Sequence, residues 1–302
     1  MNALTRIRHD GRRAEKAAYA VGAALFLSGV VHAIVLIATG GSWLGPLSMR
    51  KAVTFGLSFG LTLASVAWAT SFLTVRPRLR TALLGAFTAA SVAEVALVST
   101  QAWRGVPSHF NFETPFDNVV SMTLAAGGGV IILTIIGFTA AALVEPGPEA
   151  ASLRLAVRAG LVVLLVALAT GAVMIARGVV EARGGDPQGA YTTAGSLKPL
   201  HAVAMHAILV LPALAWVLRF TRWPEAHRLR VVKVAVAADA LLTAVIGVES
   251  FTGIDPLAAP LPLLALSALA GAALAGIGVY AVTGVEPAVR FTRIPIGKAR
   301  GR

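Results

Sequence analysis

The chain consists of two similar halves in tandem, and this duplication limits the folds that it can adopt. Three pairs of segments carry the similarity: residues 101–105 and 249–253, 63–68 and 211–216, and 144–146 and 285–287. The first two pairs are separated by 148 residues and the third by 141, which fits a loop near residues 106–117 that is longer than its counterpart. Membrane proteins are often built from such repeats, so we expect each half to be one structural unit.

Each half is composed largely of apolar segments. Mean hydropathy is +0.78, and 57% of the residues are apolar while only 13% are charged. Eight stretches each provide the roughly 20 apolar residues that a spanning helix needs. They lie near residues 17–39, 52–74, 81–102, 119–144, 155–176, 199–219, 231–252 and 260–283. The predicted fold class is an all-α integral membrane protein with eight transmembrane helices, arranged as two parallel four-helix repeats.

The distribution of positive charge predicts the orientation of these helices. Most of the 26 lysines and arginines lie in the two chain ends and in the second, fourth and sixth connections. The positive-inside rule places these segments in the cytoplasm, so both termini are expected on the inner side of a bacterial cytoplasmic membrane. The predicted units are a basic cytoplasmic tail at 1–16, the first repeat at 17–146, the second repeat at 147–287 and a basic cytoplasmic tail at 288–302.

This topology also accounts for the net charge of +12. The run Arg76, Arg78 and Arg80 lies between two spans, where it suits anionic lipid headgroups better than nucleic acid. The lipid bilayer is therefore the expected partner, and nucleic acid is not. The chain has no cysteine, which excludes disulfides, c-type haem attachment and thiolate metal ligands.

Polar residues within or beside the spans gather toward the outer side of the membrane. An ionisable side chain at the bilayer centre costs at least about 2.5–3.5 kcal/mol on insertion scales, so it needs a partner or a water-filled cavity. We therefore predict an outward-facing ligand-binding pocket formed from one pool of residues. These are His32, Lys51, Glu94, Gln101, Arg104, His109, Asn111, Asp117, His201, His206 and Glu249.

The third connection, at residues 103–118, has the composition of a folded lid. It combines charged and amide side chains with three phenylalanines, Phe110, Phe112 and Phe116. We expect these phenylalanines to anchor the loop, and His109 and Asn111 to face the pocket. The cation of this segment, Arg104, needs an acidic partner, and the candidates are Glu94, Asp117 and Glu249.

Three motifs stand out from the surrounding apolar sequence. They are formed by Lys51, Phe55 and Ser58; by Gln101, Arg104, Gly105, Ser108, His109, Phe110, Asn111, Thr114, Pro115 and Asp117; and by His201 and His206. In these motifs the chain resembles a family of bacterial multi-pass membrane proteins. The short loop before His201, with Lys198 and Pro199, departs from the family pattern. The resemblance implies a multi-pass fold and no particular activity.

Three classes of function are compatible with these residues. The one we favour is binding or transport of a small molecule or ion in the outward-facing pocket, where the two repeats meet. The second is a membrane oxidoreductase that uses haem b or a metal ion. Its candidate ligands are His32, His109, His201 and His206. The last two point roughly 140° apart on an α-helix, so they cannot chelate one metal ion from an intact helix. The third class is a structural or assembly partner embedded in the bilayer.

Overall fold

The computed structural model describes residues 13–45, 47–144, 147, 149–191 and 195–285. In this part of the chain the structure is helical, apart from one isolated β-bridge between Thr221 and Val285. The helices are α2 (Arg13–Ala38), α3 (Arg50–Ser71), α4 (Pro77–Arg104), α5 (Pro115–Val144), α6 (Ala151–Arg183), α7 (Pro187–Ala190), the 3₁₀ turn η1 (Gly195–Leu197), α8 (Lys198–Leu218), α9 (Glu225–Thr252) and α10 (Leu261–Thr283). Most of the predicted N-terminal tail, the whole C-terminal tail and most of the repeated segment 285–287 lie outside the described residues.

Eight helical segments of the described chain are long and apolar enough to cross a bilayer, when α7, η1 and α8 are taken together. The shortest has 22 residues and is about 33 Å long at roughly 1.5 Å per residue, against a hydrocarbon core of about 30 Å. The prediction of a multi-pass helical membrane protein is therefore confirmed.

Five helices extend at least four residues beyond the apolar stretches that predicted them: α2, α4, α5, α6 and α9. α5 begins at Pro115 instead of near 119, and α6 continues to Arg183 instead of ending near 176. Hydropathy marks the end of an apolar surface, whereas a helix end is fixed by local capping. For α5 the cap is Thr114, whose hydroxyl accepts a hydrogen bond from the backbone N–H of Asp117 at 3.1 Å. Proline at the first helical position reinforces that start.

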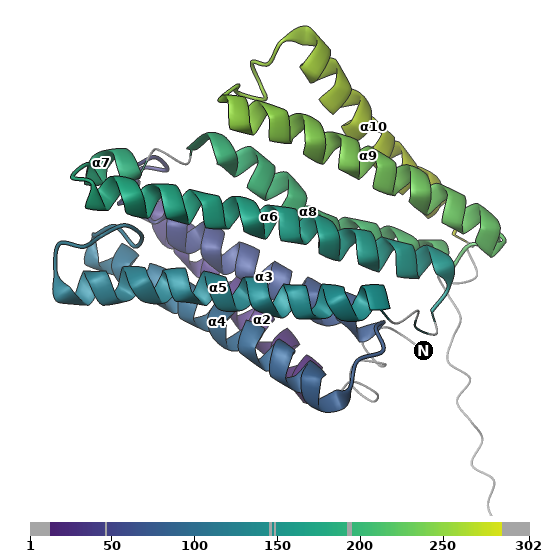
Figure 1. Cartoon of the computed structure of the whole chain (residues 1–302), viewed down its shortest axis with the longest axis horizontal. Helices are drawn as coiled ribbons and strands as arrows, with labels where there is room; N and C mark the ends of the chain where they lie inside the picture. Colours follow the sequence, from purple (N-terminus) through teal and green to yellow (C-terminus); the bar gives the residue numbers. More distant parts are fainter. Residues whose placement is uncertain (1–12, 46, 145–146, 148, 192–194, 286–302) are drawn as a thin grey trace, which may run out of the picture.

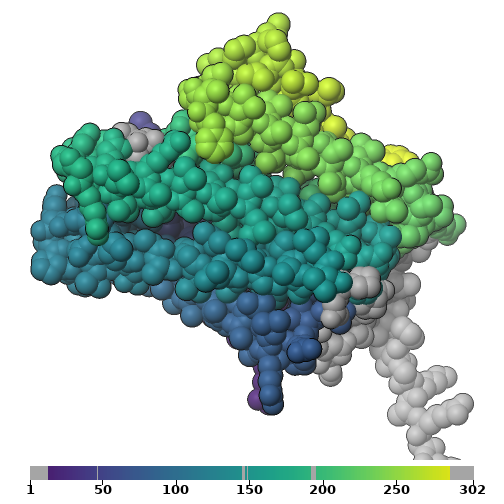
Figure 2. All heavy atoms as spheres, in the orientation of Figure 1, coloured from purple at the N-terminus to yellow at the C-terminus, as the bar shows by residue number. Residues whose placement is uncertain are grey.

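Helices pack in the same order within the two halves of the chain. α2 packs along α3, α3 against α4, and α4 against α5; α6 packs along α8, α8 against α9, and α9 against α10. The halves meet where α3 lies against α8 and α5 against α6. Figures 1 and 2 show α9 and α10 as a pair at one edge of the bundle, with the ends that the α9–α10 connection joins splayed away from the other helices. We call the side of the bundle with α7 and the α4–α5 connection, at the left of Figure 1, the Arg104 end, and the opposite side the Arg80 end.

Glycine pairs bring the backbones of α2 and α3 into close contact. A Cβ atom on Gly56 would lie 2.5 Å from the backbone nitrogen of Gly29, and one on Gly60 would lie 2.6 Å from the carbonyl oxygen of Gly22. Such small residues let membrane helices gain packing contacts along their whole length. The GxxxG spacing of α3 thus has the close-packing role that it has in other membrane helices.

At the Arg80 end, aromatic residues close the contact between α3 and α8. The rings of Trp68 and Trp216 meet edge to face, with centroids 6.2 Å apart. Each tryptophan also packs against a phenylalanine four residues later, just beyond the end of its helix, Phe72 at 5.3 Å and Phe220 at 4.8 Å. Edge-to-face rings are favourable beyond the area that they bury, so this cluster fixes the register of the two helices.

Arginines complete the helix ends beside this cluster. Arg80 is buried; it donates hydrogen bonds to the carbonyl oxygens of Thr70 and Leu73, both at 2.7 Å, and pairs with Glu15 at 3.4 Å. In the second half, Arg228 donates to the carbonyl oxygen of Thr221 at 2.7 Å. Carbonyl groups at a helix end, and in the turn that follows it, have no partner within the helix. Arg80 and Arg228 satisfy three such carbonyls here.

Candidate functional site

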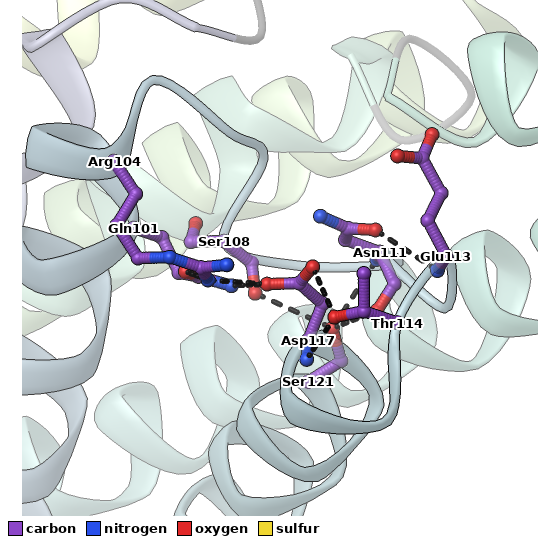
Figure 3. A network of polar contacts seen from close by, with 8 residues as sticks. All are labelled: Gln101, Arg104, Ser108, Asn111, Glu113, Thr114, Asp117 and Ser121. Carbon is purple, nitrogen blue, oxygen red and sulfur yellow. Dashed lines mark hydrogen bonds and ion pairs between the residues drawn. The ribbon is translucent and has the colours of Figure 1, made fainter.

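The most extensive polar network joins the end of α4 to the start of α5 (Figure 3). Asp117 accepts hydrogen bonds from the Gln101 amide at 2.8 Å and from the Thr114 hydroxyl at 2.6 Å, and it pairs with Arg104. Arg104 also donates to the side-chain oxygen of Gln101 and lies over the ring of Phe116, 4.7 Å from its centroid. Of the three predicted acidic partners of Arg104, Asp117 is the one that pairs with it.

The rest of the third connection folds back across the helix ends. The hydroxyl of Ser121 on α5 accepts a hydrogen bond from the backbone N–H of Asn111 at 3.2 Å and lies 3.0 Å from its carbonyl oxygen. Phe110, held at φ 61°, places its ring against Gly178 of α6. Phe112 lies beneath Arg183, whose guanidinium carbon is 5.1 Å from the ring centroid. Phe110 and Phe112 therefore connect the loop to α6.

The side chain of Phe116 is not buried, although it was predicted to anchor the third connection. Its side chain is 51% exposed, because it belongs to the first turn of α5 and supports Arg104 from outside. Asn111 is only 1% exposed, and its side-chain nitrogen has no hydrogen-bond partner among the described residues. Figure 3 shows the other end of this amide, its oxygen, accepting a hydrogen bond from the backbone N–H of Glu113 at 3.2 Å. The loop is thus anchored at two positions and leaves one buried donor free.

His109, in the third connection, packs its imidazole ring against the first turns of α3. Its ring centroid is 5.5 Å from that of Phe55, and its Nδ1 is 2.9 Å from the hydroxyl of Ser108. Burial of the ring, together with the positive charge of Lys51, lowers the pKa of His109 to about 3. The imidazole is therefore neutral at physiological pH, and it can donate or accept one hydrogen bond without adding charge.

Beside His109, positively charged residues of both halves come together. Lys51 lies within electrostatic reach of Arg50 and of Lys198, the first residue of α8. Its ammonium nitrogen is 5.8 Å from the ring centroid of Tyr191, which follows α7. We call Arg50, Lys51 and Lys198 the cation cluster. It joins the N-terminal ends of α3 and α8 at the Arg104 end of the bundle.

A cavity of about 180 Å³ lies along the contact between α3 and α8, and it is open to the surface of the bundle beside the exposed side chains of Phe26, Leu61 and His206. Its polar lining comes from three hydroxyl side chains on one face of α3 and from one histidine on α8, namely Ser58, Thr62, Ser65 and His206. Leu57, Leu61, Met205, Ile208 and Leu209 of the same two helices and Phe26 of α2 complete the walls. Since a water molecule occupies about 30 Å³ of liquid volume, the space suits a few waters or one small solute.

Hydrogen bonding of the histidines on the spans defines their tautomers. Nδ1 of His32, His201 and His206 lies 2.7, 2.7 and 2.6 Å from the carbonyl oxygens of Ser28, Ala167 and Ala202. A carbonyl only accepts, so in each neutral ring Nδ1 carries the proton and Nε2 carries a lone pair. For His32 that lone pair accepts from the indole N–H of Trp103 at 3.0 Å. His32 is therefore occupied by a structural contact between α2 and α4.

The predicted acids of the spans lie at separate places. Glu94 is 4% exposed, and its carboxylate lies where a side chain on Gly127 of α5 would stand. Glu249 on α9 is fully buried, and both of its carboxylate oxygens lack a hydrogen-bond partner within the described residues. Asp239, also on α9, has one oxygen without a partner in the same part of the chain. Burial of a carboxylate without a partner costs free energy, so these acids mark polar positions separate from the Arg104 network.

The structure thus distributes the predicted pool over several regions. It joins Gln101, Arg104 and Asp117 in one network, places His109 beside Lys51, and puts His206 in the cavity. Within the described residues, no group of three or more histidine or acidic side chains could hold a metal ion. Sequence reasoning missed Arg50, Tyr191, Thr62 and Ser65 as site residues. The spacing of Lys51, Phe55, Ser58, Thr62 and Ser65 along one face of α3 could have revealed part of this set.

Comparison of the chain with family models, curated proteins and solved structures found no match in any of the three.

Proposed function

We propose that the chain is a transport or binding protein of the bacterial cytoplasmic membrane, which admits a small solute from outside along the contact between α3 and α8. We call this contact the seam. The observation that carries the proposal is the order of features along it: the cation cluster, the cavity with its hydroxyl and imidazole groups, and the tryptophan pair. This is a polar entrance, a compartment and a closure, which are the parts that an outward-open pathway needs.

The seam also lies where we place the axis of an internal duplication. Three pairs of cavity residues differ by the same 148 positions: Leu57 and Met205, Ser58 and His206, and Leu61 and Leu209. Trp68 and Trp216, which touch, have the same separation. Equivalent residues of two repeats meet only near the axis that relates them. These pairs support two parallel four-helix repeats with a pseudo-twofold axis through the seam, and transporters often bind substrates between repeats.

The orientation of the pathway rests on the charges of the connections. The basic second, fourth and sixth connections belong to the Arg80 end, so the positive-inside rule places that end in the cytoplasm. The tryptophan pair then closes the cytoplasmic side, and the cation cluster faces outward. The predicted position of both termini in the cytoplasm follows from the same rule.

Water accessibility of single cysteines tests this proposal, because the chain has no cysteine of its own. In right-side-out vesicles, we expect an impermeant methanethiosulfonate reagent to modify Ser58→Cys from outside, as it modifies the exposed Ser42→Cys. Leu133→Cys, on a side chain that is 68% exposed on α5, is the control for a membrane-facing position and is expected to stay unmodified.

The closure is tested in inverted vesicles. There Ser58→Cys is expected to be protected while Trp68 and Trp216 are present, and to become reactive when both are changed to alanine. If Ser58→Cys reacted from neither side while Ser42→Cys reacted from outside, the cavity would not be part of a solute pathway. Reaction from the cytoplasmic side alone would contradict the outward orientation.

A further inference from the structure

Three positive charges from two helices share the entrance of the seam. Lys51 lies within electrostatic reach of Arg50 and Lys198, and Lys198 lies within reach of Arg50. None of these three cations forms an ion pair within the described residues. Like charges raise the free energy of the folded chain when they are held together. An anion bound among them reverses that effect.

The two helix N-termini strengthen the positive potential of the cation cluster. Arg50 is the first residue of α3 and Lys198 the first residue of α8. Neither Met49 nor Leu197, the residues before them, supplies a side-chain cap, and neither first turn contains an acid. Several of the first backbone N–H groups already have acceptors: Arg50 donates to the Ser48 hydroxyl at 3.1 Å, Lys51 to the Ser48 carbonyl at 3.3 Å and Leu200 to the Ser250 hydroxyl at 3.3 Å. The contribution of the two helix ends is therefore the partial positive charge of the helix dipole.

Neutral hydrogen-bonding groups lie around the same entrance. Tyr191 is next to the Lys51 ammonium group, and His109 lies near Lys51 with its imidazole neutral. Asn111, two residues along the loop, keeps a buried amide nitrogen without a partner among the described residues. A buried donor without an acceptor costs free energy, so the third connection holds one donor that a bound acceptor would stabilise.

Acidic residues near the entrance do not neutralise the cation cluster. Glu113 and Asp117 lie within electrostatic reach of Tyr191. Asp117, however, is engaged by Arg104, Gln101 and Thr114, and Glu113 is exposed at the rim of the third connection. An excess of positive charge therefore remains between the two halves.

We infer that the cation cluster binds a small oxyanion, a carboxylate or phosphate group, at the entrance of the seam. The inference rests on the proposed function, since it identifies the chemical class of solute that would use the pathway. Arginine and lysine bind oxyanions through charge-assisted hydrogen bonds, and the positive ends of the two helix dipoles favour an anion at the same place. A phosphate group offers the same chemistry whether it is free in solution or part of a lipid headgroup.

The experiment measures binding to the purified full-length chain in nanodiscs of phosphatidylcholine. Inorganic phosphate and succinate are the soluble probes, titrated by calorimetry at constant ionic strength, and phosphatidylglycerol in the disc is the lipid probe, followed by native mass spectrometry. We expect saturable binding that Lys51→Gln and Lys198→Gln each weaken by about tenfold. Arg177→Gln, which removes an exposed cation of α6 near the same end of the bundle, is the matched control and leaves binding unchanged.

Saturable binding of a soluble probe identifies a free oxyanion as the ligand, whereas retention of phosphatidylglycerol alone identifies a lipid phosphate; both outcomes support an oxyanion site if the two lysine variants lose it. Absence of both, or equal loss in Arg177→Gln, overturns the inference. Accessibility of Ser58→Cys does not depend on these charges. If that cysteine stays accessible while no anion binds, the pathway stands and its solute is not an oxyanion.

Discussion

Replacing Gly56 with alanine tests the contact that holds α2 against α3. The added Cβ would lie 2.5 Å from the nitrogen and 2.6 Å from the Cα of Gly29, and 3.0 Å from the carbonyl oxygen of Leu25. All three are backbone atoms, so no side chain can rotate away, and the helices must separate by about 1 Å to restore van der Waals contact. Overpacking of this kind costs about 1–3 kcal/mol. With rigid backbone on both sides we expect about 3, less about 1 gained from the better helix propensity of alanine.

The expected net loss is therefore about 2 kcal/mol of unfolding free energy. It is measured by reversible unfolding in mixed micelles of mild detergent and dodecyl sulfate, followed by circular dichroism. Gly85→Ala on α4 is the matched control, because a Cβ there meets nothing within 4 Å. That variant is expected to be neutral or stabilised by up to about 1 kcal/mol. Equal effects of the two substitutions would show that the close approach of α2 and α3 contributes nothing to stability.

Three further outcomes are expected from the third connection and its contacts. Asp117→Ala removes the acceptor of the buried Gln101 amide and of two other donors, so unfolding free energy should fall by about 3 kcal/mol, and a loss below about 1 would refute the network's role. The pKa of His109 is lowered to about 3 in the folded chain, so the stability that its neutral imidazole contributes is fully present above the unfolded pKa near 6.5 and is lost as the pH falls toward 3. His109→Gln should therefore reduce the loss of unfolding free energy between pH 7 and 5 by about 1–2 kcal/mol. An unchanged pH profile would contradict the lowered pKa. Gly178→Ala would place a Cβ 2.4 Å from the Phe110 ring, so it should release the loop and increase its proteolysis, while equal cleavage of the two proteins would count against anchoring by Phe110.

Much of the fold follows from apolar patterning alone. Eight stretches of sufficient length gave the number of spans, because in a bilayer every backbone polar group must be satisfied within its own helix. The ends of the helices were less predictable. α5 starts at Pro115 because the Thr114 side chain caps it, and such a local hydrogen bond leaves no mark on hydropathy. The length of α6, which continues to Arg183, was missed for the same reason.

The candidate site was predictable in residue type but not in grouping. Depth in the membrane correctly suggested that Arg104 would meet an acid, since a charged group near the bilayer needs a partner. Depth does not say which face of a helix a side chain occupies. Hence His32, which bonds to Trp103, and Glu94, which lies against Gly127, were pooled with residues of the seam. Side-chain direction depends on how helices pack, and periodicity within one helix does not specify its neighbour.

The proposed duplication sets equivalent positions of the two halves side by side for comparison. Gln101 and Glu249 are 148 positions apart, and each lies one turn before a left-handed glycine that ends its helix. In the first half the long third connection supplies Asp117, which together with Arg104 satisfies Gln101. The short α9–α10 connection supplies no such partner among the described residues, and Glu249 keeps both oxygens unpaired. An unpaired buried acid lowers stability, so its presence at a position where glutamine fits the same fold argues that the second half retains the acid for a function.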